Sequence, residues 1–310
     1  MQLNYPILTI SDTHIGHPAT QVRDAEQLAP LFKDSATVVF NGDTAEMLCR
    51  RHRDVGQAQM EKVGAVSLEQ NATPIFLNGN HDPVVSTANH LDLYNSAMLI
   101  THGDILFHDL APWAREAEIL GPAHTEILRS FSDEALADFE KRLFAVKEAS
   151  ISLEMHDLLV PRSIFAKVLM VMRECWPPSR TLRILKFWGE TPQRAAMLAQ
   201  IFRPLAKFVL IGHTHRAGIW NVDGRTIINT GSFLPFSGKL AVLMEETKVQ
   251  VRKIVERRKE FVLGKTVAEF PVEAAVREED ERFAPRPAVV EDFLLAPLPL
   301  EDGVLEEAAY

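Results

Sequence analysis

The sequence predicts an α/β fold, in which short buried strands alternate with helices. Seven short apolar runs, rich in β-branched residues and bounded by Gly, Asn or Asp, are typical of buried strands. In chain order they are ILTIS, TVVFNG, PIFLNG, AMLITHG, FVLIGH, TIINTGS and KLAVLME. Helical patterns separate the first three runs, and strands that alternate with helices indicate a layered sheet structure.

Apolar spacing predicts the helices. Residues 20–34 place apolar side chains on one helical face, and residues 56–70 show a second helical pattern. Between about residues 110 and 207 strand signals are replaced by helical ones, and TPQRAAMLAQIF offers a Thr cap and a Pro at the first helical position. We therefore expect a helical insertion over about residues 110–207, between two strands.

The expected organisation is one main domain over residues 1–245, which includes the insertion, and a C-terminal extension over residues 246–310. The alternating segment KVQVRKIVERRKEFVL predicts either a strand or a helix. After about residue 271 the chain becomes rich in Pro, Ala and acidic residues, which is typical of a partly disordered arm.

The composition is that of an ordinary globular protein. The chain has 310 residues, of which 46% are hydrophobic and 24% charged, enough for one large domain or two smaller ones. A net charge of −9 argues against broad electrostatic attraction to nucleic acid. Two cysteines are too few for a disulfide framework, and the start MQLNYPILTI lacks the pattern of a signal peptide, so a cytoplasmic location is expected. No apolar run approaches the ~20 residues that span a bilayer.

Most of the predicted strands are followed by side chains that bind metals. In chain order these are Asp12 and His14, Asp43, Asn80, His102, and His213 and His215. Residues two apart in extended backbone point to the same side, so Asp12 with His14, and His213 with His215, can each offer a pair of ligands. Because ligands bind at the carboxyl ends of strands in α/β sheets, we expect the topology to bring these groups together.

These side chains predict two divalent cations rather than one. Mixed carboxylate, imidazole and amide ligands suit Mn, Fe, Zn or Co better than Mg or Ca. Seven ligands are too many for one catalytic metal with open positions, but they suit two cations about 3.5–4 Å apart that share a carboxylate. We expect two Mn²⁺ ions, with Fe, Zn or Co as alternatives.

The motifs follow one another as Asp-x-His, Gly-Asp, Gly-Asn-His-Asp, His-Gly and Gly-His-x-His. This set resembles the calcineurin-like metallophosphoesterase superfamily, over roughly residues 7–243 apart from the helical insertion. The resemblance implies a four-layer α-β-β-α sandwich of two sheets with a two-metal site at one edge. It also implies a hydrolase of phosphate esters, in which a metal-bridging hydroxide attacks phosphorus.

The resemblance gives each motif residue a role. Asp12, His14 and His215 would hold the first cation, Asn80, His102 and His213 would hold the second, and Asp43 would bridge them. His81 matches the catalytic histidine, which contacts the leaving-group oxygen or the scissile phosphate. Glu46 takes the position of the carboxylate that orients this histidine in phosphatase members. This chain has GDTAEM where those members have Asp followed by Arg-Gly, which disfavours the protein Ser/Thr phosphatase branch.

Two further segments bear on the substrate. Arg50, Arg51 and Arg53 either grip a second phosphate or a carboxylate, or form a solvated helix face. Residues 160–188 are apolar, Met-rich and basic, which is typical either of a peripheral membrane contact or of helices packed on the core. The position of the insertion is similar to that in the UDP-diacylglucosamine pyrophosphatases of lipid A synthesis. Those enzymes have Gly-Asn-Arg-Asp where this chain has Gly-Asn-His-Asp, so their Arg takes the position of His81.

The ester class stays open between phosphodiester, phosphomonoester and pyrophosphate bonds. The expected partner is a small-molecule or lipid-linked phosphate ester. A lipid pyrophosphatase and a non-catalytic metal-binding scaffold of the same fold are the alternatives. Nucleic acid is a less expected partner, because the chain is acidic and shows no interleaved basic and aromatic groove. The sequence does not indicate an oligomeric state.

Overall fold

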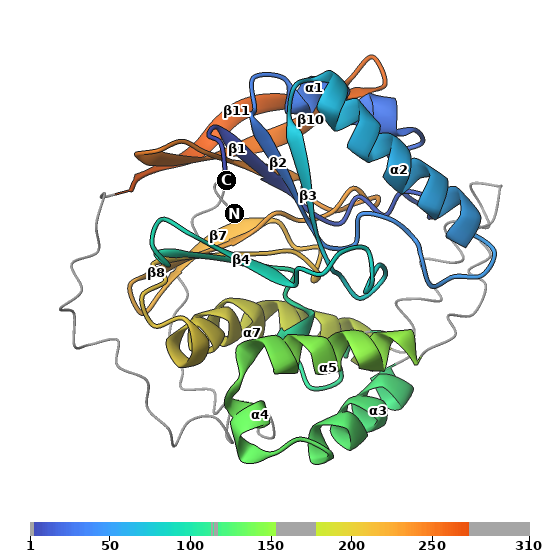
Figure 1. Ribbon diagram of the computed structural model, residues 1–310, viewed down its shortest axis with the longest axis vertical. Helices are drawn as coiled ribbons and strands as arrows, with labels where there is room; N and C mark the ends of the chain where they lie inside the picture. Colours follow the sequence, from blue (N-terminus) through green and yellow to red (C-terminus); the bar gives the residue numbers. More distant parts are fainter. Residues whose placement is uncertain (1–2, 113, 115–116, 153–177, 273–310) are drawn as a thin grey trace.

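The protein is a sandwich of four layers. The computed structural model describes residues 3–112, 114, 117–152 and 178–272. Two mixed β-sheets pack face to face, and helices cover the outer face of each sheet (Figure 1). The predicted α/β class and the α-β-β-α layering are therefore confirmed.

The first sheet has six strands in the order β11-β10-β9-β1-β2-β3. The strands are β1 (Ile7–Ile10), β2 (Thr37–Asn41), β3 (Thr73–Leu77), β9 (Leu240–Met244), β10 (Lys248–Arg257) and β11 (Glu260–Pro271). The first three run parallel to one another, and β9, β10 and β11 are joined antiparallel to the open side of β1. The carboxyl ends of β1, β2 and β3 therefore lie at one edge.

The second sheet has five strands in the order β4-β5-β6-β8-β7. The strands are β4 (His90–Leu93), β5 (Met98–Thr101), β6 (Phe208–Ile211), β7 (Gly218–Val222) and β8 (Arg225–Asn229). The three inner strands are parallel, and β4 and β7 flank them as antiparallel edges. All seven predicted strands are present. The edge strands of this second sheet, β4 and β7, were not predicted, because they are short, half-exposed and partly polar.

The helices fall into two groups. The first sheet is covered by η1 (Ala25–Leu28), α1 (Ala29–Phe32) and α2 (Arg53–Glu69). After β5 come η2 (Asp104–Leu106), α3 (Ala117–Arg129), α4 (Asp133–Ala137), α5 (Phe139–Ile151) and α7 (Pro178–Phe202). The described part of residues 110–207 contains helices and no strand, which confirms the helical insertion there, while residues 153–177 lie outside the described part. Among the described helices, none has both the length and the apolar character needed to cross a membrane.

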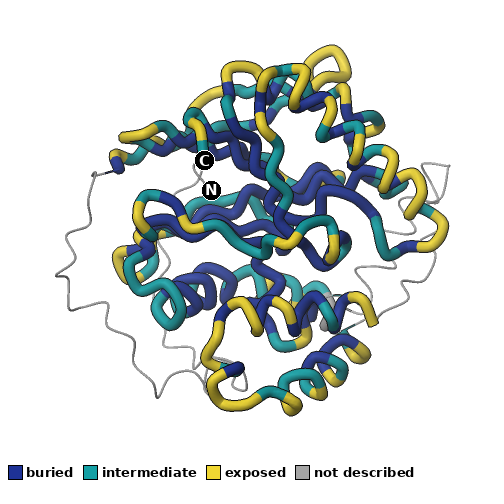
Figure 2. Tube along the Cα trace, viewed as in Figure 1, coloured by how far each residue is buried: buried dark blue, intermediate teal, exposed yellow. Residues whose placement is uncertain are grey.

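Successive side chains along each strand point to opposite faces of the sheet, and this divides the core into three layers. In β1, Leu8 packs with the helices of the first layer, while Ile7 faces the other sheet. In β6, Val209 packs with the insertion helices, while Leu210 faces the first sheet. This period of two is the one that extended backbone imposes. Figure 2 shows the result, with buried strands at the centre and exposed residues on the outer helices.

The helix predicted over residues 20–34 is shorter in the structure, where only residues 25–32 are helical. The Thr20 hydroxyl donates to the carbonyl of Thr13 and accepts the N–H of Val22, so this part of the chain forms a turn. Asp24 then caps the helix that follows. Local side-chain hydrogen bonds thus outweigh the helical pattern of the first residues.

Helix α7 begins at Pro178, so the cap predicted from TPQRAAMLAQIF is wrong and Pro192 lies inside the helix. A proline in a helix interior cannot donate to the carbonyl four residues earlier, which here belongs to Trp188. The Nη1 of Arg216 donates to that carbonyl instead, at 3.1 Å. A side chain from outside the helix therefore supplies the missing hydrogen bond.

The alternating segment after residue 245 forms strands rather than a helix. Because β10 pairs with both β9 and β11, the first sheet continues past the domain boundary expected at residue 245. Residues 273–310, where a partly disordered arm is expected, lie outside the described part of the chain.

Candidate metal centre

The seven candidate ligand side chains meet where parallel strands of both sheets end. Asp12 and Asp43 follow β1 and β2 of the first sheet, and His102 and His213 follow β5 and β6 of the second. All four side chains are buried. The site therefore lies across the two sheets, at the edge formed by their carboxyl ends.

Four of the side chains form a first set. Asp12, His14, Asp43 and His215 each offer one ligand atom, and these atoms lie within 4.8 Å of one another. The Nε2 of His215 lies 3.2 Å from Asp12 Oδ1 and 3.2 Å from His14 Nε2. These are the residues that the resemblance assigns to the first cation, together with the shared carboxylate.

A second set lies on the other side of the same carboxylate. It contains Asp43, His102 and His213. The Nε2 of His102 lies 3.2 Å from Asp43 Oδ2 and 3.1 Å from Asn80 Oδ1. Asp43 therefore belongs to both sets, as a bridging ligand would.

The local backbone lets these groups approach closely. A Cβ atom at Gly79 would lie 2.2 Å from Asp43 Oδ1, and one at Gly212 would lie 2.2 Å from Asp12 Oδ2. Only glycine leaves this space, so the carboxylates are held against bare backbone. Buried imidazoles, carboxylates and one amide in this arrangement fit divalent cations that accept both nitrogen and oxygen ligands.

His81 lies beside the first set and contacts Glu46. The Oε1 of Glu46 lies 3.1 Å from the Nδ1 atoms of both His14 and His81. The backbone N–H of His81 donates to Asp43 Oδ1 at 2.8 Å. Glu46 is fully buried, whereas the side chain of His81 is 20% exposed and can be reached from solvent. The structure thus brings together the two residues that the resemblance pairs.

The order of the motifs, their places after the strands and the four-layer sandwich all agree with one pattern. The chain has the four-layer sandwich and the clustered motif residues that the resemblance to calcineurin-like metallophosphoesterases implies.

Comparisons with known proteins add only distant similarities. No protein-family model and no curated protein matches the sequence. A predicted phosphoesterase from Streptococcus pneumoniae is 14% identical with a TM-score of 0.36, and the alignment covers 86% of this chain and 97% of that chain. Vps29 from Cryptosporidium parvum is 12% identical with a TM-score of 0.39, covering 87% and 100%. A cold-active protein-tyrosine phosphatase from a Shewanella species is 14% identical with a TM-score of 0.34, covering 81% and 78%. Similarity this low assigns no activity.

Hydrogen bonds to backbone carbonyls orient two imidazoles of the candidate centre. The Nδ1 of His102 lies 3.0 Å from the carbonyl of Asn41, and the Nε2 of His213 lies 2.8 Å from the carbonyl of Leu110. A ring nitrogen that donates its N–H to a carbonyl leaves the other nitrogen to act as a ligand. His102 would therefore present Nε2, and His213 would present Nδ1.

The charges of the site shift the pKa values of its members. Burial alone would raise the pKa of Asp43, but the imidazoles of His102 and His81 lower it well below its ordinary value. Burial alone would lower the pKa of His81, but the carboxylates of Glu46 and Asp43 raise it to about 10. A bound cation would oppose this rise, because its charge repels the proton. The carboxylates around His81 thus favour its protonated, hydrogen-bond-donating form.

Two asparagines that support the site were missed by the sequence analysis. The Nδ2 of Asn41 donates to the carbonyl of Thr101, and the Nδ2 of Asn229 donates to the carbonyl of Gly212 and to Thr214 Oγ1. Each asparagine is the last residue of a strand, β2 or β8, that leads into the site. An amide at a buried strand end was the signal that could have identified them.

The three arginines proposed for substrate binding lie on the surface. Arg50, Arg51 and Arg53 are exposed, and Arg53 opens helix α2. The Nε of Arg53 donates to the carbonyl of Met47 at 2.9 Å. A role for these arginines in substrate binding stays a prediction.

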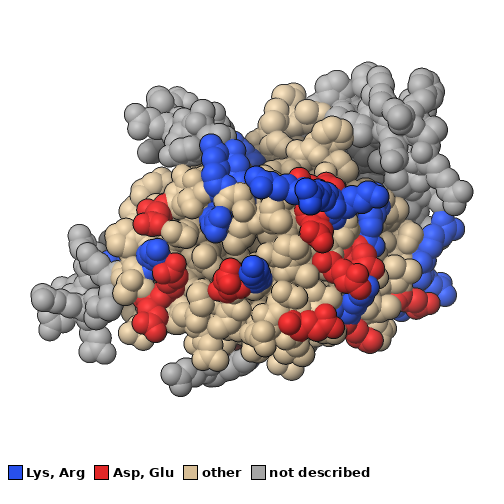
Figure 3. Space-filling view, turned by 90° about the horizontal axis from the view of Figure 1, so that it is seen from above, with Lys and Arg blue, Asp and Glu red and all other residues tan. Residues whose placement is uncertain are grey.

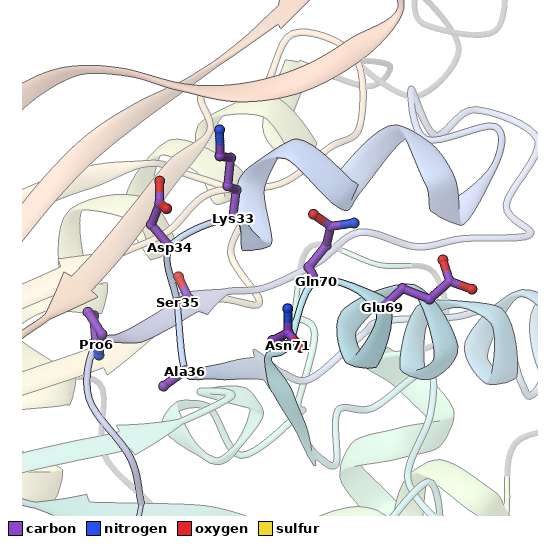
Figure 4. A pocket seen from close by; sticks show the side chains of 8 residues that line it. All are labelled: Pro6, Lys33, Asp34, Ser35, Ala36, Glu69, Gln70 and Asn71. Carbon is purple, nitrogen blue, oxygen red and sulfur yellow. The ribbon is translucent and has the colours of Figure 1, made fainter.

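A surface pocket of about 470 Å³ lies away from the candidate centre (Figure 4). Pro6, residues 33–36 and residues 69–71 line it, and these residues precede strands β1, β2 and β3. The candidate ligands follow these parallel strands, so the pocket lies at the opposite edge of the sheet.

Proposed function

We propose that this chain is a hydrolase of phosphate esters that depends on two divalent cations. The observation that supports this proposal is the pair of ligand sets that share the Asp43 carboxylate. Two cations held there would act as Lewis acids, which activate water and neutralise charge on the phosphoryl group. The mixed ligands favour Mn²⁺, with Fe, Zn or Co as alternatives.

Each candidate residue then has a defined task. Asp12, His14 and His215 would hold one cation, Asn80, His102 and His213 would hold the other, and Asp43 would serve both. The Nδ1 edge of His81 faces Glu46, so its Nε2 is left to donate a hydrogen bond to the phosphate or the leaving-group oxygen. Glu46 holds the ring in this orientation and favours its protonated form.

The proposed substrate is a small-molecule or lipid-linked phosphate ester, with a phosphodiester, phosphomonoester or pyrophosphate bond. We do not expect nucleic acid, because the net charge is −9. On the face seen from above in Figure 3, Lys and Arg side chains gather in a band across the upper part of the described surface, and Asp and Glu side chains lie mostly below it. A cytoplasmic location stays a prediction.

Hydrolysis of bis-p-nitrophenyl phosphate in the presence of Mn²⁺ tests the proposal. We expect turnover that a chelator abolishes and added Mn²⁺ restores. His81→Ala should lower kcat by roughly 100-fold or more while leaving the amount of bound Mn²⁺ unchanged, because a general acid contributes about that much. His90→Ala is the matched control, since His90 lies on β4 and contacts Asp92 and Glu140.

The alternatives give different results. If Mn²⁺ binds without turnover, and His81→Ala does not differ from wild type, the results would favour a non-catalytic metal-binding scaffold over an enzyme. A parallel screen of nucleotide sugars, cyclic nucleotides, phosphomonoesters and acylated substrates identifies the ester class. A strong preference for an acylated nucleotide sugar would favour the lipid pyrophosphatase alternative.

A further inference from the structure

Helix α7 of the insertion contacts the loop that holds two of the candidate ligands. The indole N–H of Trp188 donates to the carbonyl of Thr214 at 2.9 Å. Thr214 lies between His213 and His215, so this hydrogen bond is one residue away from each. A side chain of the insertion therefore contacts the backbone of the loop that carries these two candidate ligands.

A second hydrogen bond joins the same two elements in the opposite direction. Because Pro192 has no N–H, the carbonyl of Trp188 lacks its usual partner within the helix. The Nη1 of Arg216, the residue after His215, donates to this carbonyl at 3.1 Å. The guanidinium of Arg216 also lies 6.0 Å from the centroid of the Trp188 ring. Trp188 thus binds the loop with its side chain and with its backbone.

The loop needs support of this kind. His213 and His215 have φ angles of 63° and 57°, in the left-handed region that residues other than glycine rarely adopt. Such a conformation persists only where the surroundings hold it in place. On the side of the sheet, Asn229 holds the side chain of Thr214. On the side of the insertion, Trp188 holds its carbonyl.

The insertion also orients the imidazole of His213. Its Nε2 lies 2.8 Å from the carbonyl of Leu110, at the point where the insertion begins. Both ends of the insertion, Leu110 at the start and α7 near the end, therefore contact the loop formed by residues 212–216.

We propose that Trp188 is a positioning residue for the metal centre, through which helix α7 holds the 212–216 loop in its ligand-binding conformation. The helical insertion is then a structural part of the centre. This inference rests on one part of the proposed function, the binding of cations by His213 and His215, and it does not depend on the ester that is hydrolysed.

Trp188→Phe tests the inference, because it keeps an aromatic ring and removes the indole N–H. Calorimetric titration with Mn²⁺ should show affinity weakened by about 10-fold or more, as for other partners that orient metal ligands. Activity should fall at low Mn²⁺ and return at saturating Mn²⁺, whereas thermal unfolding in the presence of chelator should stay that of the wild type. Trp220→Phe is the matched control, because its ring also packs on Arg216, at 5.5 Å, but lies on strand β7.

Pro192→Ala is a second variant, which leaves Trp188 itself unchanged and removes only two carbons from a buried side chain. The backbone N–H of Ala at this position can donate to the Trp188 carbonyl, and it would compete with the hydrogen bond from Arg216 Nη1. Mn²⁺ affinity should therefore fall several-fold. Wild-type Mn²⁺ affinity in both variants would overturn the inference. Absence of Mn²⁺ binding by the wild type would instead defeat the proposed function, so the two failures are distinguishable.

Discussion

Glu46 joins the candidate metal centre to the candidate catalytic residue. Its carboxylate contacts a candidate ligand, His14, and the candidate catalytic residue, His81. Burial would raise the pKa of Glu46, but the charge of His81 and the hydrogen bonds from both imidazoles lower it below its ordinary value. A single buried negative charge therefore orients two rings with different tasks.

Glu46→Gln should lower kcat by roughly 10- to 100-fold, because the amide keeps the size of the side chain but removes the charge that orients His81. The effect should be much smaller in a His81→Ala background, since Glu46 acts on the substrate through that ring. Steady-state kinetics of the wild type, both single variants and the double variant measure this coupling. Losses that simply multiply would show that the two residues act independently.

At the scale of elements, strand β4 is joined to the residue that follows helix α7 by a polar contact with a defined pH dependence. The Oδ2 of Asp92 lies 2.8 Å from the Nε of Arg203 and 3.2 Å from the Nε2 of His90. Burial would raise the pKa of Asp92, but the hydrogen bonds from His90 and Arg203 lower it below its ordinary value. A carboxylate with a lowered pKa stabilises the fold above its unfolded pKa of about 3.9, and this contribution is lost as the pH falls through the folded pKa.

Asp92→Asn should therefore lower the free energy of unfolding by roughly 1 kcal/mol at pH 7, a value reduced for partial exposure. The difference from wild type should shrink below about pH 4, where the Asp92 carboxylate of the unfolded chain begins to be protonated before that of the folded chain. Urea unfolding at pH 7 and near pH 3 measures it, with Glu61→Gln on the exposed face of α2 as a control. A difference of the same size at both pH values would contradict the assignment to the Asp92 charge.

Helix α5 is anchored by a buried ion pair between Lys147 and Asp104, which begins the short helix η2. The residues are 3% and 0% exposed, so each charge depends on the other for compensation. Lys147→Met should lower the free energy of unfolding by roughly 3 to 5 kcal/mol, because it leaves a buried carboxylate without a partner. Adding Asp104→Asn should recover part of this loss. Denaturant unfolding of both variants tests the pair, and a double variant less stable than Lys147→Met would contradict it.

At the scale of the whole molecule, the sequence predicts the strands that are buried on both sides. All four residues of β1 and all four of β6 are buried, so their apolar runs were recognisable without knowledge of their partners. The candidate ligands that follow β1, β2, β5 and β6 were predictable for the same reason, whereas Asn80 follows β3, in which only Leu77 is buried. The division of the strands into two sheets was not, because β1 pairs with β9 from more than two hundred residues away, and only the family resemblance implied the sandwich.

Other features depend on tertiary contacts that leave no local pattern. The edge strand β4 contains His90 and Asp92, whose partners Glu140 and Arg203 come from the insertion. The hydrogen bonds of Trp188 with Thr214 and Arg216 likewise exist only after α7 has packed against the second sheet. Pro192 was misinterpreted as a helix start, because the sequence does not show that Arg216 would bond to the carbonyl it frees.

In the proposed centre, Asp43 joins two cation sites into one. Electron paramagnetic resonance of the protein titrated with Mn²⁺ tests this arrangement. We expect saturation at two Mn²⁺ ions per chain, with the spectrum of an exchange-coupled pair, because one carboxylate would bridge ions about 3.5–4 Å apart. Saturation at one ion, or a spectrum of isolated Mn²⁺ at full loading, would contradict it.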